Sequence, residues 1–208
     1  MLRIWGRNTS INVQKVLWAI GELGIAHERI DVGGSFGKTD TAEYRGMNPT
    51  GLVPTLQEDD FTLWESNAIC RYLCHAHAPH SKLWPQEPHA RANVDRWMDA
   101  QQTLLNRPIG VVFWGLVRTP PEKRDQTAID NGKVKTTDAV KIMDAQLGKT
   151  AFMAGDAFSY GDIPVGVMTR RYMELVPERP KMANLERWFG EISARDAFKE
   201  HCGGIPLT

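Results

Sequence analysis

The sequence predicts a small α/β domain followed by an all-helical domain. The first part alternates β-like runs with amphipathic segments, in the order strand, helix, strand, then two strands and a helix. Three prolines then crowd residues 79–88, which excludes a helix there and is typical of a connection between domains. After these prolines, apolar residues recur at helical spacing. These observations give the fold class, α/β plus all-α.

The bulk composition is that of an ordinary globular chain without a surplus of either charge. Hydrophobic residues make up 42% of the 208 residues, and 25 Lys and Arg balance 25 Asp and Glu. Because no basic surplus exists to bind phosphates, we expect no nucleic-acid partner. Arg3, Arg7 and Lys15 interrupt the apolar positions near the start of the chain, so we expect no signal peptide, no membrane segment and a cytoplasmic location.

The chain is expected to begin with a strand, a helix and a second strand. A β-like run covers residues 2–5 and is ended by Gly6. From Asn12 onward apolar residues recur at helical spacing, and Gly24 closes this helix. A second β-like run covers residues 27–32. The first and last strands of such a unit are parallel.

A hairpin and a helix are expected next. Residues 53–57 and 61–64 form two β-like runs around an acidic turn at residues 58–60, which is the pattern of a β-hairpin. The helix that follows starts at Ser66. These elements complete the α/β domain.

The three cysteines lack the spacing of a disulfide framework. Cys70 and Cys74 lie four residues apart, so they share one face of the helix that starts at Ser66. We predict that both are small buried residues of a core helix. A metal site that recruits the neighbouring histidines is the alternative, but the tetrahedral ligand spacing is missing and we expect no metal.

The second half of the chain contains four predicted amphipathic helices. Their apolar faces are marked by residues 94–105, 136–147, 163–174 and 185–192. Residues 159–162, Ser-Tyr-Gly-Asp, have the form of a capping box with aspartate in the third helical position. We therefore expect one domain over residues 1–78, a linker over 79–87 and a helical domain over 88–208.

One part of the α/β domain has the features of a ligand site. Pro54 lies in a strand-like run directly after the turn at residues 48–51, and a proline tolerated there is a candidate cis peptide that aims the preceding backbone at a ligand. Glu65 and Ser66 fall where the next helix begins. An exposed backbone donor and acceptor, a helix N-terminus and one carboxylate together suit a small zwitterionic peptide such as glutathione.

Four segments, residues 10–16, 48–56, 64–69 and 159–164, together carry a family resemblance. In this order, and around a proline-rich linker, they resemble the cytosolic glutathione S-transferases, with a bacterial, theta-like or nu-like active-site loop. The resemblance covers essentially the whole chain. It implies a thioredoxin-like N-terminal domain that carries the glutathione site, a helical C-terminal domain that carries most of the acceptor pocket, and a homodimer.

The resemblance also implies how glutathione is held. The backbone of Val53, before Pro54, pairs with the cysteinyl unit, while Glu65 and Ser66 hold the γ-glutamyl end. The alternative is that Glu65 and Ser66 only cap the following helix and hold no ligand. Leu52 departs from the family pattern, because many relatives place a basic or amide side chain there for the glycyl carboxylate. Lys38, in a glycine-rich loop, is the substitute that the sequence offers.

A transferase of this kind needs glutathione as a thiolate, since the thiol is a poor nucleophile near neutral pH. The resemblance assigns a hydroxyl donor to Ser10 and an amide donor to Asn12. Thr9 is a further candidate for this donor. The alternative is that Thr9 or Ser10 only caps the following helix.

The acceptor pocket is expected around Phe113 and Trp114, although core packing is the default role of any aromatic side chain. The resemblance implies conjugation of the glutathione thiolate to small apolar electrophiles, with glutathione as co-substrate. Two alternatives stay open. Asn12 favours a glutathione-dependent peroxide or disulfide reductase, and the departure at Leu52 favours a non-catalytic binding or regulatory protein. No cysteine lies in residues 9–13, so no mixed disulfide is expected there.

Overall fold

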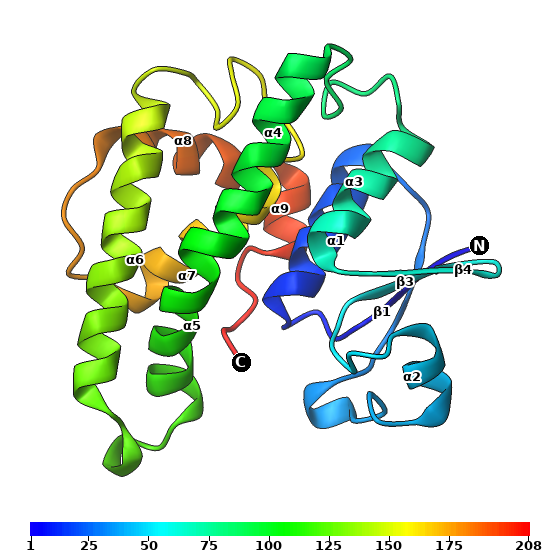
Figure 1. The fold of residues 1–208 in the computed structure, drawn as a ribbon, viewed down its shortest axis with the longest axis horizontal. Helices are drawn as coiled ribbons and strands as arrows, with labels where there is room; N and C mark the ends of the chain where they lie inside the picture. The colour runs from blue at the N-terminus through cyan, green and yellow to red at the C-terminus, as the bar shows by residue number, and fades with distance from the viewer. The chain divides into compact units, whose positions relative to one another are not determined.

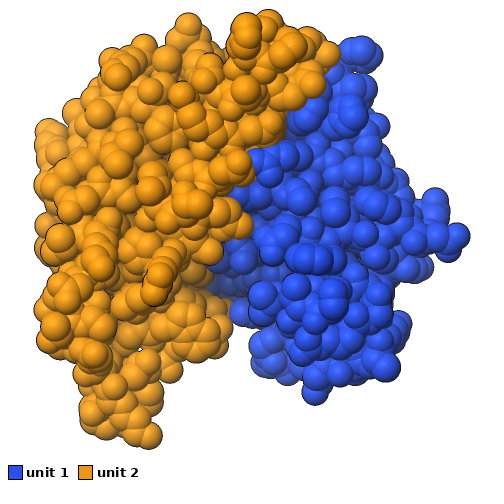
Figure 2. Space-filling model, in the orientation of Figure 1, with its two compact units in different colours: residues 1–84, 196–206 blue, residues 85–195, 207–208 orange.

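The computed structural model describes residues 1–208, and the chain divides into two compact units (Figure 2). Unit 1 comprises residues 1–84 and 196–206, and unit 2 comprises residues 85–195 and 207–208. None of the helices is both long and apolar enough for a membrane crossing.

Unit 1 is built on a four-stranded mixed sheet with the strand order β2-β1-β3-β4. The strands are β1 (Leu2–Trp5), β2 (Glu28–Ile30), β3 (Thr55–Glu58) and β4 (Phe61–Trp64). Strands β1 and β2 are parallel, as the strand–helix–strand pattern predicts, and β3 pairs antiparallel with both β1 and β4. The sheet is thioredoxin-like and confirms the predicted fold class.

Helices lie on both sides of this sheet. Figure 1 shows α1 and α3 together on one side and α2 on the other. The helix α2 was not predicted from the sequence and is only six residues long. Thr41 is its N-cap, and the Thr41 hydroxyl accepts a hydrogen bond from the Tyr44 backbone N–H. The helical segments of unit 1 are α1 (Ile11–Leu23), η1 (Gly34–Phe36), α2 (Ala42–Met47), α3 (Ser66–His77) and α9 (Asp196–His201).

The core of unit 1 forms around α1, whose residues from Val13 to Ile20 are all buried. Gly24 ends the helix with φ 65°, a left-handed conformation that glycine adopts without a steric penalty. Cys70 and Cys74 of α3 are fully buried, which confirms their predicted place on a core helix. Burial raises the pKa of the Cys70 thiol to about 12.

Two boundaries of unit 1 differ from the predicted domains. Residues 79–84, predicted as linker, belong to unit 1, because Leu83 and Trp84 are buried and the Trp84 ring stacks on His75 at 5.2 Å. Residues 196–206 also belong to unit 1 and not to the helical region over 88–208. Phe198 of α9 packs edge-to-face on Trp18 of α1, with ring centroids 4.9 Å apart.

Unit 2 is all-helical, with α7 at its centre. Eleven of the 14 residues of α7 are buried, because α4, α5 and α8 all pack against it. Helix α4 begins at Pro88, and the Glu87 carboxylate caps it by accepting hydrogen bonds from the backbone of His89 and Ala90. The segments are α4 (Pro88–Ala100), η2 (Gln101–Leu105), α5 (Asn106–Phe113), η3 (Trp114–Arg118), η4 (Pro121–Lys123), α6 (Gln126–Leu147), α7 (Asp162–Leu175) and α8 (Ala183–Ser193).

The predicted capping box before α7 forms in a modified way. The Asp162 carboxylate reaches back and accepts a hydrogen bond from the Ser159 backbone N–H at 2.9 Å, as a capping box requires. The Ser159 hydroxyl, however, donates to the same carboxylate at 3.0 Å and does not accept a bond from the helix. The remaining Asp162 oxygen accepts from the backbone of Met153 and from the indole of Trp188.

Candidate functional site

The loop before β3 is held by the side chain of Asn48, which is 1% exposed. Its oxygen accepts hydrogen bonds from the backbone N–H and the hydroxyl of Thr50, and its nitrogen donates to the Leu52 carbonyl and to the Thr55 hydroxyl. The Tyr44 hydroxyl also donates to the Leu52 carbonyl, at 2.7 Å. These bonds fix the backbone directly before Val53.

The Val53–Pro54 peptide bond is cis, as the position of the proline predicts. Neither the backbone N–H nor the carbonyl of Val53 has a hydrogen-bond partner within the chain. Val53 is half-buried and lines a small pocket together with Pro54. An adjacent backbone donor and acceptor of this kind can pair with the backbone of an extended peptide.

The N-terminus of α3 supplies a second part of the same pocket. Glu65 precedes the helix with φ 71°, a left-handed conformation that is uncommon for a residue with a side chain. Its carboxylate makes no capping hydrogen bond, so helix capping does not explain why a glutamate occupies this position. Ser66 is the first helical residue and is 3% exposed. The unpaired N–H groups and the dipole at this helix start favour an anion, and Glu65 favours a cation.

The N-terminus of α1 brings the third part. Ser10 is the N-cap residue of α1 by its backbone conformation, but its hydroxyl makes no capping hydrogen bond. Asn12 lies in the first turn and lines the pocket, and its Oδ1 atom is buried without a hydrogen-bond partner. The oxygen and nitrogen of an amide exchange places by a half-turn of the group, so Asn12 can present either a donor or an acceptor there.

The structure thus brings five of the six predicted catalytic and glutathione-binding residues to one pocket. Asn12, Val53, Pro54, Glu65 and Ser66 line it, whereas Ser10 does not. Glu65 is the one charged residue among the lining side chains. Leu52, expected at the glycyl end of glutathione, also lines the pocket. Three further lining residues were not predicted, namely Asn48, Thr50 and Trp64. An Asn followed two positions later by Thr is a turn signal for the first two, and adjacency to Glu65 points to Trp64.

No basic side chain lines this pocket. Leu52 is 67% exposed at its rim and carries no charge. Lys38, the predicted substitute, is exposed in the loop after η1, with φ 68°, and is not among the residues that line the pocket. Neither residue therefore places a cation among the side chains that line this pocket.

The predicted acceptor residues belong to unit 2 and differ sharply in exposure. Phe113, the last residue of α5, is 6% exposed, and its ring lies 4.0 Å from the guanidinium carbon of Arg171. Trp114, the next residue, is 64% exposed. The two rings meet edge-to-face with centroids 6.4 Å apart. Trp114 thus offers an open apolar surface, and Phe113 a buried one.

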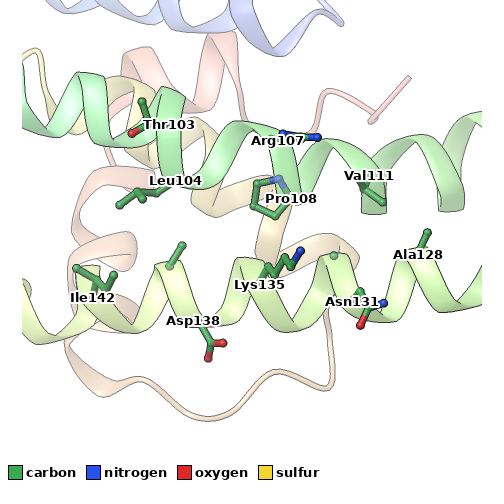
Figure 3. A pocket seen from close by; sticks show the side chains of 12 residues that line it. Thr103, Leu104, Arg107, Pro108, Val111, Ala128, Asn131, Lys135, Asp138 and Ile142 are labelled. Carbon is green, nitrogen blue, oxygen red and sulfur yellow. The ribbon is translucent and has the colours of Figure 1, made fainter.

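Unit 2 also has a groove of about 680 Å³ along α5 and α6, separate from Phe113 and Trp114. Figure 3 shows the two helices side by side, with Leu104, Pro108 and Val111 on one wall and Ile142 on the other. Leu104, Val111 and Ile142 are exposed apolar side chains. This groove was not predicted from the sequence.

Comparisons with known proteins agree with this geometry. Two family models match, "Glutathione S-transferase, N-terminal domain" over residues 9–76 and "Glutathione S-transferase, C-terminal domain" over residues 105–196. The chain is 43% identical to glutathione S-transferase GstB of Escherichia coli K12 over 204 residues, which is 96% of this chain and 97% of that protein.

Solved structures give the same result. The theta class glutathione S-transferase of Xanthomonas axonopodis pv. citri, solved with glutathione bound, matches with a TM-score of 0.94 and 40% identity, over 100% of this chain and 99% of that one. Glutathione transferase F2 of Populus trichocarpa matches with a TM-score of 0.87 and 27% identity over 99% of each chain. The chain therefore belongs to the glutathione S-transferase family.

Proposed function

We propose that this chain binds reduced glutathione in the pocket formed by Asn12, Val53, Pro54, Glu65 and Ser66 and joins its thiolate to small apolar electrophiles. The observation that carries the proposal is the meeting, in one pocket, of an unpaired backbone donor and acceptor, a helix N-terminus and a single carboxylate. Each of these groups matches one group of glutathione, and the name of the Xanthomonas relative supports the choice of ligand.

The proposed orientation follows from charge and hydrogen bonding. The backbone N–H and carbonyl of Val53 pair with the cysteinyl unit, since both lack partners within the chain. The α-carboxylate of the γ-glutamyl end meets the start of α3 at Ser66, where the helix dipole is positive. The ammonium group of the γ-glutamyl unit pairs with the Glu65 carboxylate. The glycyl carboxylate faces the rim at Leu52, where it stays in contact with water.

Asn12 is the residue we propose for stabilising the thiolate. Its amide lines the pocket and has a buried atom without a partner, and an amide N–H₂ donates well to a sulfur anion. Ser10 is the alternative donor, because its hydroxyl is not used as a helix cap. Ionisation releases the thiol proton to solvent. The sulfur lone pair then forms a bond to the electrophilic carbon, and the leaving group departs with its bonding pair.

The electrophile is assigned to Phe113 and Trp114 of unit 2, whose rings provide apolar surface. The proposed role of the enzyme is detoxification, in the cytoplasm.

We also propose a homodimer, in which a second copy covers the groove along α5 and α6. The exposed apolar side chains of Leu104, Val111 and Ile142 support this assignment. Sedimentation that finds a monomer at micromolar concentration would contradict it.

Turnover with two kinds of substrate tests the reaction. Conjugation predicts that the protein, glutathione and benzyl chloride give S-benzylglutathione, identified by mass, faster than the reaction without enzyme. The reductase alternative, which Asn12 favours, predicts instead that cumene hydroperoxide is consumed and oxidised glutathione accumulates. A protein that turns over neither substrate and does not bind glutathione would contradict the proposal and favour the non-catalytic alternative.

A further inference from the structure

Arg171 of α7 is a buried cation without a hydrogen-bonding partner. The residue is 8% exposed, and its Nε atom is buried with no hydrogen-bond acceptor. No carboxylate or carbonyl of the chain accepts a bond from any nitrogen of its guanidinium. Burial lowers the pKa of Arg171 to about 10. An uncompensated buried charge destabilises a fold, so its presence calls for a function.

The contact with Phe113 satisfies Arg171 only in part. The guanidinium carbon lies 4.0 Å from the centroid of the Phe113 ring, which is a cation–π contact. A ring face attracts positive charge but does not accept the in-plane N–H groups of a guanidinium. The N–H groups along the edge of the Arg171 guanidinium therefore find no hydrogen-bond acceptor in the ring. A guanidinium edge of this kind fits a carboxylate in a bidentate geometry.

A second arginine approaches the same ring. The guanidinium carbon of Arg118 lies 5.7 Å from the Phe113 centroid and 6.0 Å from that of Trp114. Arg118 is exposed and forms no ion pair. Its charge lowers the pKa of Arg171, as expected of two like charges near each other. The two cations repel one another unless an anion lies between them.

The surrounding charges leave this cluster positive. Arg170 and Glu174, one turn apart on α7, form an ion pair at 2.6 Å. Glu174 is the one carboxylate whose charge raises the pKa of Arg171, and it is already paired with Arg170. Arg171 and Arg118 therefore have no ion pair of their own, beside two aromatic rings.

We propose that Arg171 and Arg118 form an anion subsite of the acceptor region, so that the preferred electrophiles are aromatic molecules that carry a carboxylate. The inference rests on the proposed function, because it places the electrophile at Phe113 and Trp114. The aromatic body of the substrate stacks on the exposed Trp114 ring. The substrate carboxylate accepts two hydrogen bonds from the N–H groups of Arg171, and Arg118 supplies a second positive charge.

The reaction of such a substrate balances without any further reactant. With 4-(chloromethyl)benzoate, the glutathione thiolate forms a carbon–sulfur bond at the benzylic carbon, and the carbon–chlorine bond breaks to release chloride. The substrate carboxylate is unchanged, and no electron donor or acceptor is needed. Its neutral counterpart, 4-methylbenzyl chloride, reacts in the same way but lacks the carboxylate.

Kinetics with this matched pair of substrates tests the subsite. In the unmodified protein, we expect a higher kcat/KM for the carboxylate substrate than for the neutral one. Arg171→Met should lower kcat/KM for the carboxylate substrate about 10-fold to 100-fold, the range for losing hydrogen bonds to a charged group. The value for 4-methylbenzyl chloride and the KM of glutathione should stay within about twofold. Arg118→Met should act in the same direction and less strongly, because Arg118 is exposed.

Arg195→Met is the matched control. Its guanidinium carbon lies 4.1 Å from the Phe158 ring, so it removes a comparable cation–π contact elsewhere in unit 2. We expect it to affect both substrates equally. Arg171→Met should keep a melting temperature at or above that of the unmodified protein, because it removes a buried uncompensated charge. A lower melting temperature with equal losses on both substrates would mean that Arg171 is structural, which overturns the proposal.

Binding of unreactive 4-methylbenzoate, followed by calorimetry, separates this inference from the proposed function. If neither chloride is turned over, the proposed reaction fails, but weaker binding of 4-methylbenzoate to Arg171→Met would still support an anion subsite. Absence of 4-methylbenzoate binding to the unmodified protein would overturn it. A raised KM for glutathione in Arg171→Met would also overturn it, because the anion would then be a carboxylate of glutathione.

Discussion

The indole N–H of Trp188 in α8 donates a hydrogen bond of 3.0 Å to the carboxylate of Asp162 at the start of α7, and both side chains are completely buried. The same carboxylate accepts bonds from the backbone of Met153 and from the backbone and hydroxyl of Ser159. Burial raises the pKa of Asp162, while these four hydrogen bonds oppose that rise. Four donors in unit 2 thus depend on one side chain.

Asp162→Asn should therefore destabilise the protein, although the shape of the side chain is kept. The amide N–H₂ would face N–H donors and leave them unsatisfied in the interior. We expect the free energy of unfolding to fall by about 3 to 5 kcal/mol, the range for breaking one side of a buried charged network. Urea unfolding followed by tryptophan fluorescence measures this change.

Glu191→Gln is the control for this prediction. Glu191 forms an exposed ion pair with Arg187 on α8, so its loss should change the free energy of unfolding by less than about 1 kcal/mol. Equal stability of the two variants would show that the Asp162 network does not hold α7 and α8 together.

Asn12→Ala should lower kcat/KM for conjugation about 10-fold to 1000-fold, as expected when one donor to a developing or stabilised anion is deleted. The thiol of bound glutathione would then ionise at higher pH, so the rise of kcat/KM with pH should move upward. Steady-state rates with benzyl chloride across a pH series provide both readouts.

Asn106→Ala, on the exposed start of α5, serves as the matched amide control and should leave the profile unchanged. Unaltered kinetics in Asn12→Ala together with a large loss in Ser10→Ala would transfer the role to the Ser10 hydroxyl. The pocket lining favours Asn12, since Ser10 does not contribute to it.

The three cysteines should be unreactive in the folded protein. Cys70, Cys74 and Cys202 are completely buried, and burial raises the pKa of both Cys70 and Cys74. Because the thiolate is the reactive form, an aromatic disulfide reagent should label none of them in buffer and all three in guanidinium chloride. Rapid labelling of one thiol in buffer would mean that α3 or α9 opens readily.

His201 should make the stability of unit 1 depend on pH. Burial lowers the pKa of His201 below its usual 6.5, and the charge of His27 adds to this effect while Glu200 opposes it. The unfolded chain therefore binds the proton more readily than the folded one. Stability is full above pH 6.5 and falls as the pH drops through the lowered folded pKa.

Melting temperatures between about pH 7.5 and pH 5.5 test this dependence. His201→Gln should flatten the acid side of the curve, whereas His89→Gln should not, because the His89 side chain is 96% exposed. Parallel curves for the unmodified protein and His201→Gln would rule out His201 as the titrating group.

The sequence was most informative where a local signal sets the geometry. A proline after a turn predicts the cis peptide at Val53–Pro54, and the start of α3 follows from Glu65 and Ser66, so most of the pocket could be predicted. Contacts between distant residues could not. Phe198 packs on Trp18, 180 positions away, and no local pattern identifies that pairing. The unused hydroxyl of Ser10 and the unpaired fork of Arg171 likewise depend on tertiary contacts.

The most direct test of the glutathione site is calorimetric titration of reduced glutathione into the unmodified protein, Ser66→Ala and Ser193→Ala. Ser193 is a half-buried serine at the end of α8, so it controls for loss of a hydroxyl outside the pocket. We predict binding of one glutathione per chain, at least about 10-fold weaker binding to Ser66→Ala, and unchanged binding to Ser193→Ala. No binding by the unmodified protein, or equal binding by all three, would contradict a glutathione site at the start of α3.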